Sequence, residues 1–167
     1  MYENHKKIWI TGASSGIGKA VAEKFAKEGW QVAVSARRKE ILDDMAKNPN
    51  ISSYPLDVVN EENCSSTFQK IISEFEQIDL CIFCSGTYDP KKEKNIDLKQ
   101  SRFIMDVNYF GVLNCIKAVE KYFKDKRKGH VSIVSSIAGY RGLPNSSGYG
   151  PSKAALNNFA ESIFFDF

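Results

Sequence analysis

Apolar and polar positions follow two different rhythms along the chain. Short, nearly continuous apolar runs are separated by longer stretches in which apolar residues recur every three or four positions. The first pattern predicts buried strands, and the second predicts helices that bury one face. The predicted strands cover residues 6–12, 30–36, 51–58, 78–86 and 129–136. The predicted helices cover residues 17–28, 37 to about 47, 61–76, 98–124 and 150–167.

The order of these elements determines the expected fold class. Strands and helices alternate, and strands that are apolar nearly throughout are typical of a parallel sheet with helices on both faces. Polar loops occupy residues 87–97 and 139–148. No linker, repeat or low-complexity stretch divides the sequence. We therefore expect one α/β domain over residues 1–167.

Composition and charge exclude several classes of protein. The 167 residues are 43% hydrophobic and 26% charged, which is typical of a globular domain. The net charge of +3 is too small to indicate a nucleic-acid partner, and the basic run 121–130 lies where a helix should end, a favourable place for cations. The N-terminal residues lack a signal-peptide core, and no run of about 18 apolar residues occurs. We expect a cytoplasmic protein with no membrane partner.

Cysteine and histidine positions give no sign of a redox or metal site. Four cysteines fall where helix or strand interiors are predicted, and a reducing compartment would leave them as thiols: Cys64, Cys81, Cys84 and Cys115. Cys81 and Cys84 have the spacing of a redox motif, but residues three apart in a strand point to opposite faces. His5 and His130 are isolated from each other, so we expect no metal ion.

The first chemical signal is ITGASSGIGKA, between the first strand and the first helix. Its glycines, Gly12, Gly16 and Gly18, permit a tight turn and a close approach of a ligand to the backbone. The first N–H groups of the following helix are free to bind a phosphate. Close packing of helix on strand can alone require such glycines. The strand before the turn and the amphipathic helix after it favour phosphate binding.

A second signal is YGPSK, which places Tyr149 and Lys153 four residues apart at the start of the last helix. At that spacing two side chains share a helix face. An ordinary phenol, with a pKa of about 10, exchanges protons near neutrality only when a neighbour favours its ionised form. A cation about 4 Å away contributes about 4 kcal/mol at an effective dielectric of about 20. The pair suits proton transfer, although an ordinary surface pair at a helix start would have the same spacing.

With TGASSGIG near the N-terminus and YGPSK downstream, the sequence resembles the short-chain dehydrogenase/reductase family. The resemblance covers essentially the whole chain. It extends to LDV at 56–58, VNYFG at 107–111 and SIVSSIAG at 132–139. It implies an NAD(P)-dependent enzyme with a Rossmann-type, doubly wound parallel sheet of strand order 3-2-1-4-5, which holds the cofactor at the carboxyl ends of its strands.

The resemblance also implies roles for four residues. The tyrosine matching Tyr149 exchanges a proton with the substrate oxygen, while the lysine matching Lys153 assists it and holds the nicotinamide ribose. The serine matching Ser136 hydrogen-bonds the substrate oxygen, and its neighbour Ser135 is the alternative. Asn108, in the middle of a predicted helix, would support a proton-relay water near the lysine; otherwise it is a tolerated exposed amide.

The end of the second predicted strand indicates which cofactor is preferred. Sites for NAD(H) usually have an acid there, whereas this sequence has Ala36 followed by Arg37 and Arg38. Two guanidinium groups suit a 2′-phosphate, so we expect NADP(H) rather than NAD(H), unless the arginines only begin a charged helix. Asp57, with Val58 beside it, resembles the residue that meets the adenine amino group; it could instead cap the next helix.

One segment departs from the family pattern. Many members have N-N-A-G after the fourth strand, where this chain has Phe83, Cys84, Ser85 and Gly86, so the hydrogen bonds of the first Asn side chain are missing. Gly86 still permits close approach to a cofactor. The other residues expected at the cofactor lie in the glycine-rich turn: Gly12, Ser14, Ser15, Gly16, Ile17 and Gly18.

The function implied by these residues is NADP(H)-dependent hydride transfer to or from a carbonyl or alcohol carbon of a small molecule. The alternative is a regulatory or inactive protein that binds a dinucleotide without catalysis. A flavodoxin-like domain would share the layers but would not account for YGPSK. Family members often pair through helices matching 98–124 and 150–167, which implies a homodimer or homotetramer. The partly apolar loop 137–148 does not identify the substrate.

The last predicted helix has no recognisable stop. It ends NNFAESIFFDF, with apolar residues still at helical spacing and without a terminal Gly, Lys or Arg. Asp166 would be unfavourable at a helix C-terminus. Family members continue with further strands, and without them strand 129–136 would be an unprotected edge. We expect the native protein to be longer, or the 167-residue form to have little activity and poor solubility.

Overall fold

The computed structural model describes residues 6–165, so the predictions for His5 and Asp166 lie outside the described residues. Five parallel strands form one sheet in the order β3-β2-β1-β4-β5, which confirms the predicted fold class and strand order. The strands are β1 (Lys7–Thr11), β2 (Gln31–Ser35), β3 (Ile51–Ser53), β4 (Leu80–Phe83) and β5 (His130–Ile133).

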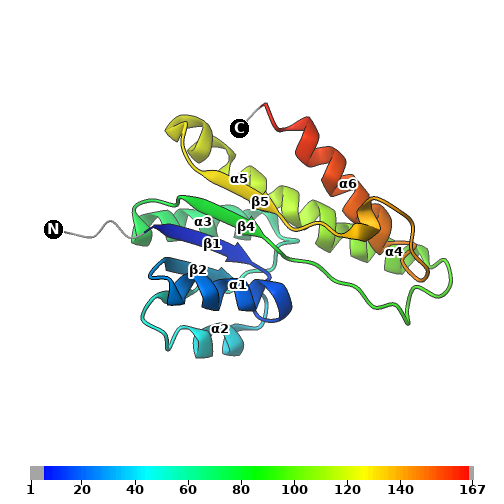
Figure 1. Ribbon diagram of the computed structural model, residues 1–167, viewed down its shortest axis with the longest axis horizontal. Coiled ribbons are helices and arrows are strands. Elements are labelled where there is room, and N and C mark those ends of the chain that lie inside the picture. Colours follow the sequence, from blue (N-terminus) through cyan, green and yellow to red (C-terminus); the bar gives the residue numbers. More distant parts are fainter. Residues whose placement is uncertain (1–5, 166–167) are drawn as a thin grey trace.

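Helices cover both faces of this sheet (Figure 1). They are α1 (Gly16–Lys27), α2 (Lys39–Met45), α3 (Glu61–Phe75), α4 (Leu98–Met105), α5 (Gly111–Lys126) and α6 (Tyr149–Ser162), with a π-helix η1 (Asp106–Phe110) and a 3-10 helix η2 (Ile137–Gly139). Alternation along β1 separates two cores. Ile8 and Ile10 pack on the side of α1 and α2, while Trp9 stacks on Phe68 of α3, with 5.5 Å between ring centroids. The sequence pattern predicted this arrangement because each helix buries one face against the sheet.

Some predicted boundaries were wrong. The segment predicted as strand 51–58 leaves the sheet after Ser53, although the N–H groups of Tyr54 and Leu56 still bond to the chain beside them. Pro55, between them, has no N–H donor. The other strands are also shorter than predicted. The last helix ends at Ser162 rather than 167.

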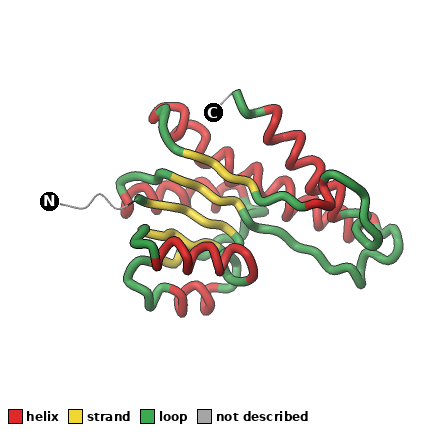
Figure 2. The backbone as a smooth tube through the Cα atoms, viewed as in Figure 1, coloured by secondary structure: helices red, strands yellow, loops and turns green. Residues whose placement is uncertain are grey.

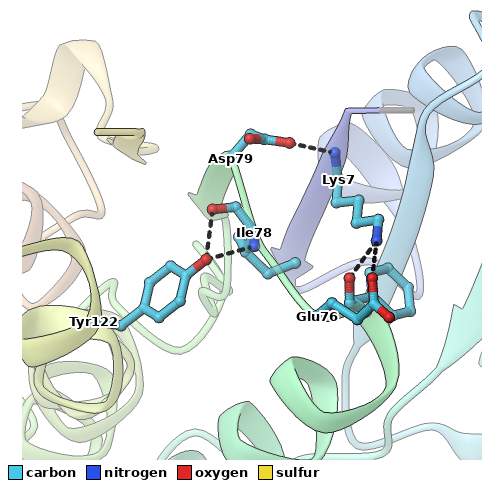
Figure 3. Close-up of polar contacts among 6 residues, drawn as sticks. Lys7, Glu76, Ile78, Asp79 and Tyr122 are labelled. Atoms are coloured by element: carbon cyan, nitrogen blue, oxygen red, sulfur yellow. Dashed lines mark hydrogen bonds and ion pairs between the residues drawn. The ribbon is translucent and has the colours of Figure 1, made fainter. Parts of the chain in front are cut away.

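Polar contacts fasten the amino ends of β1 and β4 (Figure 3). The backbone N–H of Lys7 donates to the Asp79 carboxylate over 2.8 Å, and the Lys7 ammonium lies 4.0 Å from Glu76. The Tyr122 hydroxyl accepts from the N–H of Ile78 at 2.9 Å and donates to its carbonyl at 3.4 Å. These contacts tie β1, the α3–β4 connection and α5 together.

All four cysteines are free thiols. Three lie in helix or strand interiors as predicted, but Cys84 lies just after β4 and is only half-buried. Burial raises the pKa of the Cys81 thiol well above its ordinary value. No helix within residues 6–165 combines the length and apolarity needed to cross a bilayer.

Candidate active site

A cavity of about 400 Å³ opens at the carboxyl ends of the strands, beside the starts of α1 and α6. Its lining comes from the segments that follow all five strands, from η1 and from α6. The residues predicted from the sequence that line it are Gly12, Ser14, Ser15, Ile17, Gly18, Arg37, Arg38, Asp57, Val58, Gly86, Tyr149 and Lys153. Gly16, Asn108 and Ser136 are not part of the lining.

The glycine-rich turn packs against the end of β4. Gly12 has a φ of +70°, and a Cβ at that position would lie 2.6 Å from the carbonyl oxygen of Cys84. A Cβ on Gly18 would lie 2.5 Å from the carbonyl oxygen of Gly12. Real Cβ atoms do not approach so closely, so both positions require glycine. Gly16 begins α1. The turn thus brings bare backbone to the wall of the cavity.

The start of α1 offers backbone donors to this cavity. Ser15, the N-cap residue, makes no capping hydrogen bond with its side chain, and the first turn of α1 has no acidic residue. The first N–H groups of α1 are therefore not capped by the Ser15 side chain or by an acid of the first turn. The helix dipole favours an anion at this position. A phosphate fits this chemistry.

Two arginines add positive charge beside the turn. The guanidinium of Arg38 donates to the Ser14 hydroxyl and to the Ser14 carbonyl, each at 3.0 Å. Both Arg37 and Arg38 are exposed at the cavity and precede α2, which begins at Lys39. Arg38 is the N-cap residue of α2, so the alternative that the arginines only begin a charged helix stays open, and the preference for NADP(H) stays a prediction.

Asp57 is exposed after β3, and its carboxylate accepts from the N–H of Val59 at 3.2 Å. The cap of α3 is instead Asn60, whose side chain accepts from the N–H of Asn63 at 2.9 Å. The alternative role of Asp57 as the helix cap is wrong. Val58 is buried beside it.

Tyr149 and Lys153 line the same cavity from α6, one helical turn apart. The Lys153 ammonium lies 5.9 Å from the centroid of the Tyr149 ring. Lys153 is 4% exposed, and its ammonium donates to the carbonyl of Val134 at 2.8 Å. Burial lowers the pKa of Lys153 from its ordinary value of 10.5, while the Coulombic effect of nearby Cys84 acts in the opposite direction. A partly desolvated cation thus lies next to the phenol ring.

Asn108 is fully buried, so the alternative of a tolerated exposed amide is wrong. It lies in the π-helical turn that interrupts the long helix predicted over 98–124; such turns are frequent at functional sites. Its Oδ1 accepts from the N–H of Thr87 at 2.7 Å, and its Nδ2 donates to the Thr87 carbonyl at 3.0 Å and to the Ser152 hydroxyl at 3.1 Å. One amide therefore joins the segment after β4 to α6.

Replacing this amide should cost stability. Asn108→Ala is expected to lower the free energy of unfolding by about 1–3 kcal/mol, because it leaves the partly buried N–H of Thr87 without its acceptor. The matched control is Asn114→Ala in α5, whose amide donates to the carbonyl of Val58 at 2.9 Å. That carbonyl also accepts from Cys64, so the control should cost less. Urea denaturation measures both, and equal losses would contradict the prediction.

The two candidate serines occupy different positions. The Ser136 hydroxyl accepts from the N–H of Ala138 at 3.2 Å at the start of η2. Ser135 lines the cavity, and its hydroxyl donates to the carbonyl of Lys153 at 3.2 Å. The role expected of Ser136 stays a prediction, and the structure gives the alternative, Ser135, a place in the cavity wall.

Two residues missed by the sequence analysis contact Tyr149. The ring of Tyr88 stacks on that of Tyr149 with centroids 4.4 Å apart, and its hydroxyl donates to the carbonyl of Asn145 at 3.1 Å. The buried carboxylate of Glu93 accepts from the N–H of Tyr149 at 3.0 Å. Both come from the long loop between β4 and α4, which meets the start of α6 at one end of the molecule (Figure 2). A single aromatic and a single acid in a polar loop form no sequence pattern.

Comparison with known proteins agrees with this arrangement. The family model for short chain dehydrogenases matches residues 6–167. "Dehydrogenase/reductase SDR family protein 7-like" of Dictyostelium discoideum is 31% identical over 97% of this chain and 54% of its own length. A short-chain dehydrogenase from Streptomyces avermitilis is 28% identical with a TM-score of 0.86, over 98% of this chain and 60% of its own.

A second solved structure, "ElxO with NADP Bound", is 26% identical with a TM-score of 0.88, over 97% of this chain and 68% of its own. The chain spans about half the length of several curated relatives that it matches. The family model matches the chain almost from end to end. The parallel sheet of strand order 3-2-1-4-5 has the same fold as these solved structures. The chain therefore belongs to the short-chain dehydrogenase family.

Proposed function

We propose that this protein binds NADP(H) and transfers a hydride between the nicotinamide and a carbonyl or alcohol carbon of a small molecule. The observation that carries the proposal is the pairing of the Tyr149 phenol with the buried ammonium of Lys153 in the cavity wall. The glycine-rich turn and the arginines line the same cavity. A proton-transfer group and an anion site thus belong to one cavity.

The residues present fit a dinucleotide phosphate. The start of α1 and the backbone at Gly12 and Gly18 would hold the pyrophosphate, since no Cβ fills the cradle. Arg37 and Arg38 would bind the 2′-phosphate, and Asp57 with Val58 would contact the adenine. The similar structure with NADP bound supports this choice of cofactor. When bound, NADP(H) supplies or accepts the hydride.

The protein's own residues would move the proton. Tyr149 would give a proton to the substrate oxygen during reduction and remove it during oxidation. Lys153 would hold the nicotinamide ribose, with its ammonium beside the ring of Tyr149. Asn108 would hold the segment after β4 in place against the start of α6. It would also support a proton-relay water near Lys153. Ser136, or Ser135 in its place, would hydrogen-bond the substrate oxygen.

The substrate and assembly are further parts of the proposal. Ile137 and Tyr140 are exposed in the loop after β5, which favours a substrate with an apolar portion. Phe103 and Phe110 are exposed on α4 and η1, which favours a homodimer or homotetramer through these helices and α6.

A turnover assay tests the proposed function. The purified native protein should oxidise NADPH in the presence of aldehydes or ketones, measured as loss of nicotinamide absorbance. The panel should include ketones with apolar substituents. The competing class, a dinucleotide-binding protein without catalysis, would bind NADPH in a fluorescence titration yet leave the absorbance constant with every compound.

A further inference from the structure

Glu93 is a buried acid in an otherwise charged and exposed loop. It is 4% exposed, although its neighbours Lys91, Lys92 and Lys94 are solvent-exposed and carry the opposite charge. Its Oε2 accepts from the N–H of Gly148 at 2.7 Å and from the N–H of Tyr149 at 3.0 Å. A single carboxylate oxygen thus binds the two residues at which α6 begins.

This contact replaces a cap that α6 lacks in its own sequence. Its N-cap residue is Gly148, which has no side chain to accept from the first N–H groups, and the first turn of α6 contains no acid. Glu93 supplies both the acceptor and the negative charge that a helix N-terminus favours, from 55 residues away. Its other oxygen, Oε1, is buried without a hydrogen-bond partner among the described residues. Burying a carboxylate with one unpaired oxygen lowers the stability of the fold. The two hydrogen bonds at the start of α6 offset this loss of stability.

The same loop also contacts the side chain of the residue that Glu93 caps. Tyr88 stacks on the Tyr149 ring, and its hydroxyl reaches the carbonyl of Asn145. Thr87, next to Tyr88, is fixed by both ends of the Asn108 amide. The loop from β4 to α4 therefore holds Tyr149 by its backbone, through Glu93, and by its ring.

We propose that Glu93 is a positioning residue for Tyr149: its carboxylate fixes the first turn of α6 and thereby the direction of the phenol. This inference rests on the proposed function of Tyr149 in proton transfer. Glu93 is absent from the lining of the cofactor cavity, so it acts through Tyr149 rather than through the dinucleotide. Its loss should affect the chemical step and leave cofactor binding intact.

Three variants separate position from stability. Glu93→Ala should lower kcat about 10- to 100-fold, the effect expected of a small misplacement of a reacting group, with the Kd for NADPH unchanged. Glu93→Gln keeps an oxygen acceptor for both N–H groups and should restore most of the rate. The matched control is Asp97→Ala, because the Asp97 carboxylate caps α4 by accepting from the N–H groups of Lys99 and Gln100 at 2.9 and 3.1 Å. This control should lower the melting temperature without lowering kcat.

Hydrogen exchange at the amides of Gly148 and Tyr149 gives a readout that needs no turnover. Exchange there should be faster in Glu93→Ala than in the wild type or in Asp97→Ala. If the wild-type protein reduces no carbonyl compound, the proposed function fails and hydrogen exchange alone decides whether Glu93 fixes the first turn of α6. Unchanged exchange then overturns the inference, and faster exchange supports the contact between Glu93 and α6.

If the wild-type protein is active, an unchanged kcat in Glu93→Ala, or a loss shared equally with Asp97→Ala, overturns the inference. Should Glu93→Ala not fold, Glu93→Asp takes its place, because it keeps the charge but shortens the reach by one methylene. A lowered kcat with unchanged NADPH affinity then supports the role, and a wild-type kcat contradicts it.

Discussion

Tyr149→Phe in the native protein should fold normally and bind NADPH as the wild type does, yet lose about 10²- to 10⁴-fold in kcat. Only the phenolic hydroxyl is removed, and the ring that stacks on Tyr88 stays in place. Steady-state turnover with the best carbonyl substrate measures the loss, and fluorescence titration with NADPH confirms that the cavity is intact.

The matched control is Tyr122→Phe, because Tyr122 lies on α5 outside the cavity lining and also loses only a hydroxyl. It should keep the wild-type rate of proton transfer. If Tyr149→Phe keeps more than about a tenth of the wild-type kcat, Tyr149 is not the proton donor, because a missing donor should reduce kcat at least about 100-fold.

Replacing both arginines after β2 by alanine should weaken NADPH much more than NADH. Each hydrogen bond to a charged group contributes about 1.5–3 kcal/mol, which corresponds to about 10- to 100-fold in Kd for each arginine. Arg37→Ala is the cleaner single variant, because Arg38 also bonds to Ser14 and its loss would disturb the turn. Titration of each variant with both cofactors measures the selectivity.

Arg102→Ala controls for the change in net charge, since Arg102 is exposed on α4 and outside the cavity lining. It should change the affinity for either cofactor only slightly, because salt screens the interaction between a distant exposed charge and the cofactor. An equal loss of NADPH and NADH affinity in the double variant would mean that these arginines do not recognise the 2′-phosphate.

The sequence predicted the layers of this fold because each strand and helix carries its own apolar pattern. Trp9 and the two isoleucines beside it alternate between two cores, and this alternation is visible in the sequence. The π-turn around Asn108 was not predictable, because one extra residue in a helical turn hardly changes the spacing of apolar positions. The early end of the strand beginning at Ile51 depends on Pro55 and on the neighbouring strand, so the apolar run alone was misleading.

In the candidate site, too, the sequence predicted the residues of local motifs but not the residues contributed by distant segments. The glycine-rich turn and YGPSK are local motifs, and the structure brings Gly12, Gly18, Tyr149 and Lys153 to one cavity. Glu93 reaches α6 across 55 residues of sequence, and no local pattern marks such a contact. Two adjacent serines cannot be separated by spacing alone, because the side chain that enters the cavity depends on how the chain turns after β5.

We expect one cavity both to bind NADPH and to deliver its hydride to a carbonyl carbon. Reduction of a ketone by the native protein with NADPH carrying deuterium at C4 of the nicotinamide tests this, with mass spectrometry of the alcohol product. The alcohol should carry one deuterium on the carbinol carbon, transferred from one face of the nicotinamide only, and this labelled product should be lost in Tyr149→Phe. Tight binding of NADPH with no deuterium in any alcohol product would contradict this expectation.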